Sequence, residues 1–126
     1  MIVKSPILPQ RVRKIPKSFS WIDHRLVSDK HIDRCDHAAA ALYLFLACVS
    51  DEEGLSYYGD KSITNKLSMD LTTLYDARST LMQTGLIAWQ KPLYQVLDLE
   101  PEQKIRQAGS VMVLGEILKR ATEVTP

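Results

Sequence analysis

Apolar positions recur with a helical period in two neighbouring stretches between residues 60 and 84. Ile63 and Leu67 lie four apart, so they share one face of a predicted helix that begins at Asp60 or Lys61 and ends at Leu67. Residues 68–70 form a predicted tight turn, in which Met69 points inward. The short turn predicts that a second helix follows at an angle to the first.

The second helix is predicted to begin at a cap, Asp70 or Thr72, and to end at Gly85, a residue suited to the left-handed position after a helix. A 3-4-3 spacing gives it one apolar stripe, predicted to be buried: Leu74, Ala77 and Leu81, with Met82 as a further candidate. The remaining side chains are predicted to face outward: Leu71, Thr72, Thr73, Asp76, Ser79, Thr80 and Gln83.

A β-hairpin is predicted after Gly85. Residues 86–89 form its first strand, Lys91 and Pro92 the reversal, and residues 93–99 the returning strand. The register of the return is open, because Gln95 interrupts the alternation of leucines. Residues 55–58 are expected to form a short strand that pairs with this hairpin.

A third helix is predicted before these elements, over the apolar run 38–49, with Asp36 as its cap. Because the run has no polar face, the helix is expected to be buried on most sides, with Cys48 as a small buried residue. Phe19 and Trp21 predict a short strand near residues 19–27, with Trp21 as a packing residue.

The two ends of the chain differ from this central region. At the C-terminal end, residues 111–121 predict an amphipathic helix that either folds back or pairs with a second copy, and a homodimer is favoured. We therefore divide the chain into an arm and short strand at 1–34, a domain at 35–100 and an oligomerisation element at 101–126.

Charge is distributed unevenly along the 126 residues, although the net charge is only +1. Residues 1–22 hold no acidic residue and three prolines, and their basic residues are Lys4, Arg11, Arg13, Lys14 and Lys17. An extended basic arm of this kind suits contact with phosphates. A tail that only aids solubility, or one that wraps a neighbouring subunit, is the alternative.

Composition excludes several classes of protein. The apolar fraction is 45 % and the charged fraction 25 %, as in ordinary globular proteins. The longest apolar run is too short to cross a membrane, no secretory signal is visible, and two cysteines form no disulfide pattern. We expect a cytoplasmic protein.

Candidate chemistry is sparse. Metal-binding residue types cluster between residues 24 and 37, but their spacing matches no familiar zinc pattern, so no metal site is predicted: the residues are His24, His31, Asp33, Cys35 and His37. No glycine-rich phosphate loop and no nucleophile with a placed histidine is present. The sequence therefore predicts neither an enzyme nor a cofactor.

The stretch from Ile63 to Ile87 resembles the winged helix-turn-helix superfamily, in frame from the first helix to the wing. Within it, the resemblance is greatest to the N-terminal domains of phage and plasmid replication-initiation or replisome-organiser proteins, followed by MarR-type and GntR-type regulators. It implies an α+β, mainly α fold: a three-helix core with a β-hairpin wing, here with an N-terminal arm and a C-terminal helix. Two amphipathic helices without this fold are the simpler alternative.

The resemblance also implies a site. Five residues fall where groove-facing residues sit in the family, and Lys91 falls at the wing tip: the five are Leu71, Thr72, Thr73, Asp76 and Ser79. This chain departs from the family at Leu71 and Asp76, where basic or neutral polar residues are common. An aspartate is repelled by phosphate unless it accepts a hydrogen bond from a cytosine amine.

The predicted function is binding of double-stranded DNA, as a transcriptional regulator or a replication initiator from a phage or mobile element. Residues 71–83 would enter the major groove. Phosphate contacts are predicted for Lys61, Lys66, Arg78, Lys91 and for the arm residues Arg11, Arg13, Lys14 and Lys17. The alternative is a winged-helix assembly module, whose face with Asp70 and Asp76 binds a protein partner.

Overall fold

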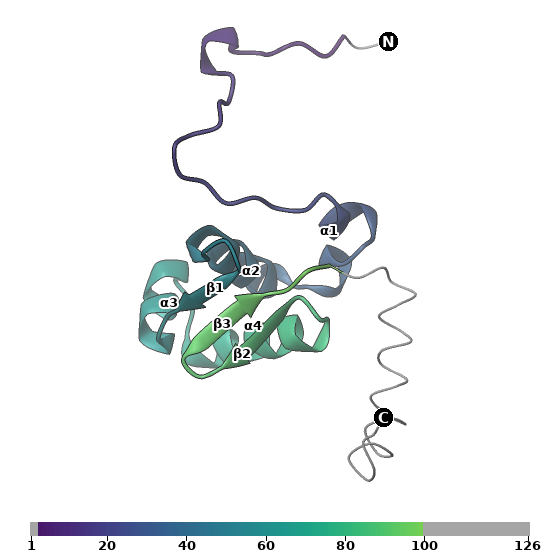
Figure 1. Ribbon diagram of the computed structural model, residues 1–126. Helices are drawn as coiled ribbons and strands as arrows, with labels where there is room; N and C mark the ends of the chain where they lie inside the picture. Colours follow the sequence, from purple (N-terminus) through teal and green to yellow (C-terminus); the bar gives the residue numbers. More distant parts are fainter. Residues whose placement is uncertain (1–2, 100–126) are drawn as a thin grey trace.

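The computed structural model describes residues 3–99, so the predicted helix within 101–126 lies outside the described residues. The described chain is α+β and mainly helical (Figure 1). Its α-helices are α1 (Arg25–Ser28), α2 (His37–Val49), α3 (Asp60–Leu67) and α4 (Leu71–Gln83). Its strands are β1 (Leu55–Tyr57), β2 (Ile87–Gln90) and β3 (Leu93–Val96), and two 3-10 turns lie at Pro9–Arg11 and Ile32–Arg34.

Helix α2 forms the centre of the domain and packs chiefly against α4. It begins where predicted, because the Asp36 side chain accepts a hydrogen bond from the Ala39 amide at 2.9 Å. Leu42 and Leu46 on α2 are fully buried. The prediction of burial on most sides was wrong for its C-terminal half, since Leu44 is 52 % exposed and Cys48 is exposed.

Helices α3 and α4 have the bounds predicted from the sequence. Ser68 ends α3 in the left-handed conformation at φ 54°, and the Asp70 side chain then accepts from the Thr73 amide at 2.8 Å to begin α4. Gly85 follows α4 at φ 77°, as its conformational freedom allows. The stripe of Leu74, Ala77 and Leu81 is buried, but Met82 is 42 % exposed, so its predicted burial was wrong.

The three strands form one antiparallel sheet in the order β1-β3-β2. In β3, Tyr94 pairs with Ser56 of β1 and Trp89 of β2. Tyr94 points inward and is fully buried while Gln95 is exposed, which fixes the register that the leucine pattern left open. The predicted hairpin is therefore present, with Lys91 and Pro92 at its turn and β3 shorter than expected.

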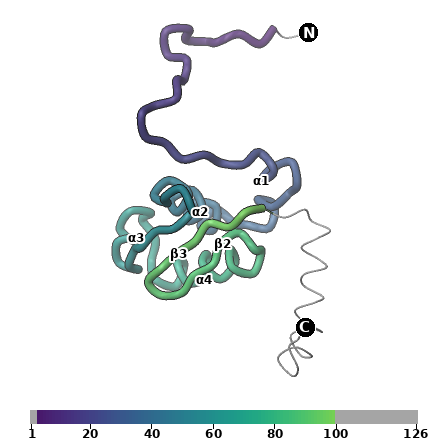
Figure 2. Tube along the Cα trace, in the orientation of Figure 1, coloured from purple at the N-terminus to yellow at the C-terminus, as the bar shows by residue number. Residues whose placement is uncertain are grey.

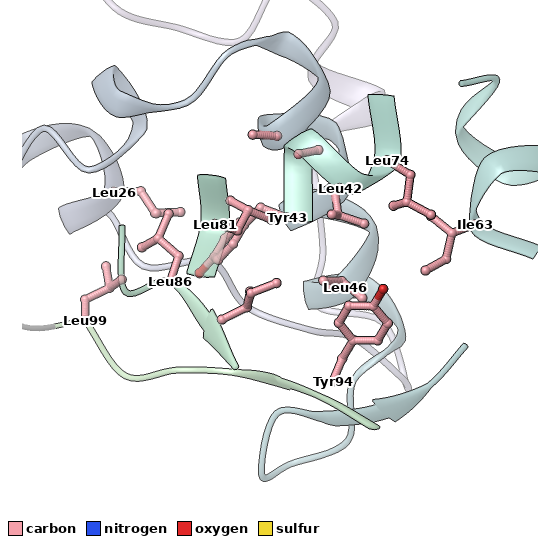
Figure 3. Packing of buried hydrophobic residues seen from close by; sticks show 13 residues of the cluster. Leu26, Leu42, Tyr43, Leu46, Ile63, Leu74, Leu81, Leu86, Tyr94 and Leu99 are labelled. Carbon is pink, nitrogen blue, oxygen red and sulfur yellow. The ribbon is translucent and has the colours of Figure 1, made fainter. Parts of the chain in front are cut away.

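The core lies between the sheet and helices α2, α3 and α4 (Figure 3). Leucine supplies most of its volume, and burial of each such side chain stabilises the fold by about 1.5–3 kcal/mol. The core side chains in the figure include Leu26, Leu42, Leu46, Ile63, Leu74, Leu81, Leu86, Tyr94 and Leu99.

The N-terminal region differs from its prediction. No strand forms in residues 19–27, because Asp23 accepts a hydrogen bond from the Arg25 amide and starts the short helix α1. Trp21, predicted to pack, is 73 % exposed, and only Leu26 of this region enters the core. Residues 3–18 run away from the domain as an arm (Figure 2). No helix among the described residues is long and apolar enough to span a membrane.

Candidate functional site

The outer face of α4 is the side of the α3–α4 pair that no other described element covers. Leu71, Thr72, Asp76 and Ser79 are exposed there, and Thr73, whose amide donates to the Asp70 cap, is half-buried. The Gln83 side-chain amide donates to Ser79 Oγ at 3.2 Å, one helical turn away. The face therefore offers hydroxyl and amide groups on a helix anchored by its opposite side.

This outer face also contains large apolar side chains. Leu71, Tyr75 and Met82 are 47 %, 48 % and 42 % exposed. The face includes one carboxylate, Asp76, and no exposed cation. Its chemistry is thus mixed polar and apolar, with slight negative charge.

Arg78 was predicted to contact phosphate, and that prediction was wrong. Its side chain is 7 % exposed, and Nη1 donates to Asp60 Oδ1 at 2.9 Å and to the Tyr94 hydroxyl at 2.7 Å. The guanidinium also stacks on the Trp89 ring, 3.8 Å from its centre. Arg78 therefore connects α4 with the start of α3 and with the hairpin, and cannot reach DNA from this position.

The bonds of Arg78 keep it charged although it is buried. Burial alone would lower the pKa of the Arg78 guanidinium, but the hydrogen bonds to Asp60 and Tyr94 outweigh burial and raise it above its ordinary value. Burial raises the pKa of the Tyr94 hydroxyl, partly offset by the bond from Arg78. Both groups thus hold their protons at neutral pH.

Three other predicted phosphate contacts are exposed. Lys61 and Lys66 lie on α3, and Lys91 lies at the turn between β2 and β3. None of the three forms an ion pair with a described residue. The structure therefore leaves these cations available at the α3 surface and at the hairpin tip, on either side of α4 in the chain.

The arm presents the other predicted cations. Arg11, Arg13, Lys14 and Lys17 are exposed, and residues 3–18 form no ion pair or side-chain hydrogen bond with the described part of the domain. Ser20 makes the first such contact, with its hydroxyl donating to the Cys48 carbonyl oxygen at 3.2 Å.

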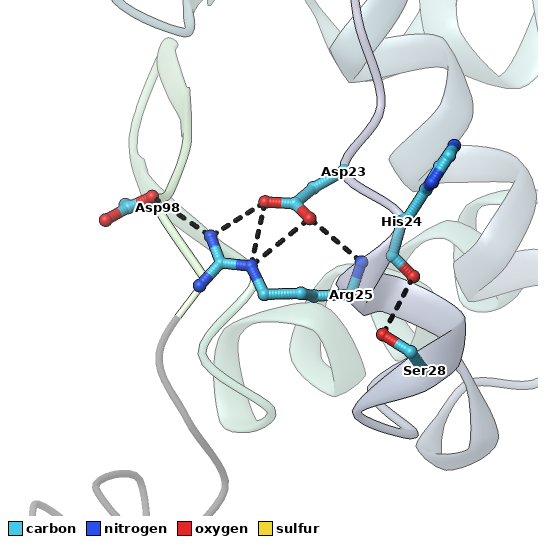
Figure 4. Close-up of polar contacts among 5 residues, drawn as sticks. All are labelled: Asp23, His24, Arg25, Ser28 and Asp98. Carbon is cyan, nitrogen blue, oxygen red and sulfur yellow. Dashed lines mark hydrogen bonds and ion pairs between the residues drawn. The ribbon is translucent and has the colours of Figure 1, made fainter.

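The root of the arm is held by an ion pair at α1 (Figure 4). Arg25 Nη2 lies 2.7 Å from Asp23 Oδ2, and 3.9 Å from Asp98 after β3. The hydrogen bonds from Arg25 lower the pKa of the Asp23 carboxyl. The pair with Asp23 is local to α1, and the contact with Asp98 connects α1 to the segment after β3.

The charges of arm and domain are opposite. Residues 1–22 contain five basic residues and no acidic one, while residues 35–99 contain four basic and eight acidic residues. One of those four, Arg78, is already paired with Asp60. Attraction for a polyanion therefore arises mainly from the arm and not from α4.

The metal-binding residue types at 24–37 do not assemble. Within residues 3–99, no three histidine, cysteine or acidic side chains are grouped closely enough to hold a metal ion. His31 is fully buried with Nδ1 3.0 Å from Arg34 Nη2, and burial raises the pKa of the Cys35 thiol, which disfavours the thiolate that metals bind.

The site residues that sequence reasoning missed are Tyr75 and the partners of Arg78. Apolar periodicity cannot identify an arginine that points inward toward an aspartate 18 positions earlier. Comparison with known proteins adds no further residue, since no family model, curated protein or solved structure matches this chain.

Proposed function

We propose that residues 35–99 are a winged helix-turn-helix domain and that the chain binds double-stranded DNA. The order of elements supports this reading: a core helix, a first strand, the α3–α4 pair and a hairpin whose second strand pairs with the first strand. In such a domain, α4 is the helix that enters the major groove and the β2–β3 hairpin is the wing.

The observation that carries the proposal is the combination of an uncovered polar face on α4 with a fully exposed basic arm. The hydroxyl groups of Thr72 and Ser79 and the amide of Gln83 are suited to base edges. Lys61, Lys66 and Lys91 contact phosphates beside the helix, and the arm follows the backbone or enters the minor groove.

With these roles, phosphate contacts supply most of the binding free energy and base contacts supply little discrimination between sequences. Phosphate contacts supply binding that does not depend on sequence. Helix α4 has no exposed arginine to bind guanine, because Arg78 is buried and paired with Asp60. We therefore propose a sequence-tolerant or moderately specific protein, as in a replication initiator or transcriptional regulator of a phage or mobile element.

A second candidate function is protein assembly through the same face. It is favoured by Leu71, Tyr75 and Met82, which are each exposed by more than two-fifths on a face that includes Asp76. Aromatic and methionine side chains are enriched in protein interfaces. In this case α4 would bind an apolar, basic surface of a partner.

Titration of a labelled random duplex by fluorescence anisotropy separates the two functions. If five arm cations contact phosphates, raising salt from about 50 to about 200 mM weakens binding about 10²- to 10³-fold. Absence of binding at about 50 mM salt would instead favour assembly.

A substitution on α4 tests the role of the helix. Asp76→Ala is expected to strengthen binding to random duplex severalfold, because it removes a carboxylate that faces phosphate. The matched control is Asp33→Ala, an exposed aspartate on the turn after α1, which leaves the affinity unchanged. Equal effects of the two variants would show that α4 does not approach the DNA.

A further inference from the structure

The arm contains exposed apolar side chains that DNA contact does not explain. Ile7 is 94 % exposed, Ile15 is 81 % exposed and Val12 is 52 % exposed. These residues are interspersed with the cations of the arm. Exposing this much apolar surface is unfavourable. A protein surface with both apolar and acidic groups would bury the apolar side chains of the arm and pair with its cations.

The domain has a groove with that composition. A cavity of about 520 Å³ lies between the arm root at 19–21, the C-terminal half of α2, the turn after it and the end of β3. Tyr43, Ala47 and Leu99 supply apolar lining. This volume falls within the range of about 300–1,000 Å³ that is usual for binding pockets.

Acidic residues surround the same groove. Glu52 and Glu53 are exposed and form no ion pair with a described residue, whereas Asp98, also at the groove, lies 3.9 Å from Arg25. The groove therefore combines an apolar lining with carboxylates free to pair with cations. Its charge is complementary to that of the arm, which has five basic residues and no acidic one.

The path of the chain favours a groove on another copy. Phe19 and Trp21 line the groove at the arm root, and residues 3–18 then lead away from the domain (Figures 1 and 2). To enter its own groove the arm would have to reverse direction immediately. Extended outward, sixteen residues span up to about 50 Å, enough to cross to a neighbouring molecule.

We infer that the groove binds the arm of a second copy of this chain. Residues 7–17 place their isoleucine and valine side chains on the apolar lining, and the cations Arg11, Arg13 and Lys14 lie against Glu52 and Glu53. Reciprocal exchange of two arms gives a closed two-fold dimer. Duplex DNA competes for the same cations, so DNA binding releases the arm from the groove.

Charge reversal of each surface tests this arm exchange in the full chain without DNA. The arm variant combines Arg11→Glu, Arg13→Glu and Lys14→Glu, and the groove variant combines Glu52→Lys and Glu53→Lys. Light scattering coupled to size-exclusion chromatography reports the mass of each and of a 1:1 mixture. The control is Asp33→Lys, an exposed carboxylate that neither lines the groove nor lies on α4.

Wild type and control are expected to be dimers that dissociate at least about tenfold more readily when salt rises from about 50 to about 500 mM. Each variant alone is a monomer, because like charges then face each other. The mixture restores a dimer, since each acidic arm meets a basic groove and each basic arm an acidic groove. A wild-type monomer at low salt, a dimer unaffected by either variant, or a mixture that stays monomeric would overturn the proposal. Because no DNA is present, none of these results depends on the proposed function.

Discussion

The Arg78 side chain points into the domain and not toward the outer face of α4. Its hydrogen bonds to Asp60 and Tyr94, and its contact with the Trp89 ring, join three separate elements. The same guanidinium on the outer face of α4 would have been a strong phosphate or guanine contact. In its inward position it instead connects α4 with α3 and with the hairpin.

Loss of this guanidinium should therefore lower stability. Arg78→Ala is expected to reduce the free energy of unfolding by about 2–3 kcal/mol, since it leaves the Tyr94 hydroxyl without its donor and Asp60 without its cation. Arg78→Lys should recover only part of the loss, because an ammonium cannot stack on Trp89 in the same way. Urea unfolding measures both. A stability equal to that of the exposed control Lys66→Ala would contradict this role.

At the residue level, the sequence predicted which positions on α4 are outward but not where Arg78 and Trp21 point. Thr72, Asp76 and Ser79 follow from helical geometry alone, which depends only on spacing. The direction of Arg78 depends on Asp60 and Tyr94, brought together by the fold. Trp21 is exposed because no described element covers the arm root, and no local pattern could indicate that.

Capping residues near the helix ends determine where the helices of the domain begin and end. Asp70 before α4 and Gly85 after it mark both ends of that helix, and Asp36 marks the start of α2, so these bounds were predictable. The strand predicted at 19–27 failed because aromatic content indicates a strand only where the segment pairs with another strand, and this segment turns into α1 instead. The groove beside α2 was not predictable, since its lining comes from three segments that are distant in the sequence.

The Asp70 cap is expected to make the stability of the fold depend on pH in the acid range. The hydrogen bonds that it accepts from the Thr73 side chain and amide lower the pKa of its carboxyl below 3.8. Its contribution is therefore present above about pH 4 and is lost as pH falls through the lowered folded-state pKa. Asp70→Asn, which keeps a capping oxygen, should flatten the loss of thermal stability below pH 4. The exposed control Asp76→Asn should retain the wild-type acid response, and identical responses of the two variants would contradict the cap.

Gly54 lies in the turn that leads into β1, and its substitution is expected to destabilise the sheet. Its φ is +84°, and a Cβ there would lie 2.5 Å from the Val96 carbonyl oxygen. Gly54→Ala should reduce the free energy of unfolding by about 2–4 kcal/mol, through backbone strain and displacement of β3. Gly59→Ala is the control, because no atom lies within 4 Å of a Cβ at that position. Urea unfolding would contradict the prediction if the two variants were equally stable.

The whole molecule is divided by charge into a basic arm and an acidic domain. Eight acidic residues in 35–99 repel a polyanion, so under the proposed function the arm would supply most of the affinity for DNA. The same opposition of charge favours arm exchange between copies. The two proposals, DNA binding and arm exchange, therefore both depend on this one segment.

Salt dependence of DNA binding measures the arm contribution. Each phosphate contact adds about −0.9 to the slope of log K against log salt, so neutralising three arm cations should make the slope less negative by about 3. The variant combines Arg11→Ala, Arg13→Ala and Lys14→Ala, and Lys30→Gln, outside the arm, is the control. An unchanged slope would show that the domain, and not the arm, makes the phosphate contacts.

Amide chemical-shift mapping of the full chain shows whether the outer face of α4 contacts duplex DNA. On addition of duplex at low salt, we expect the largest shifts at the exposed positions of residues 71–83, at Lys91 and along residues 11–17. Shifts confined to the arm, with α4 and the hairpin turn unchanged, would contradict that contact.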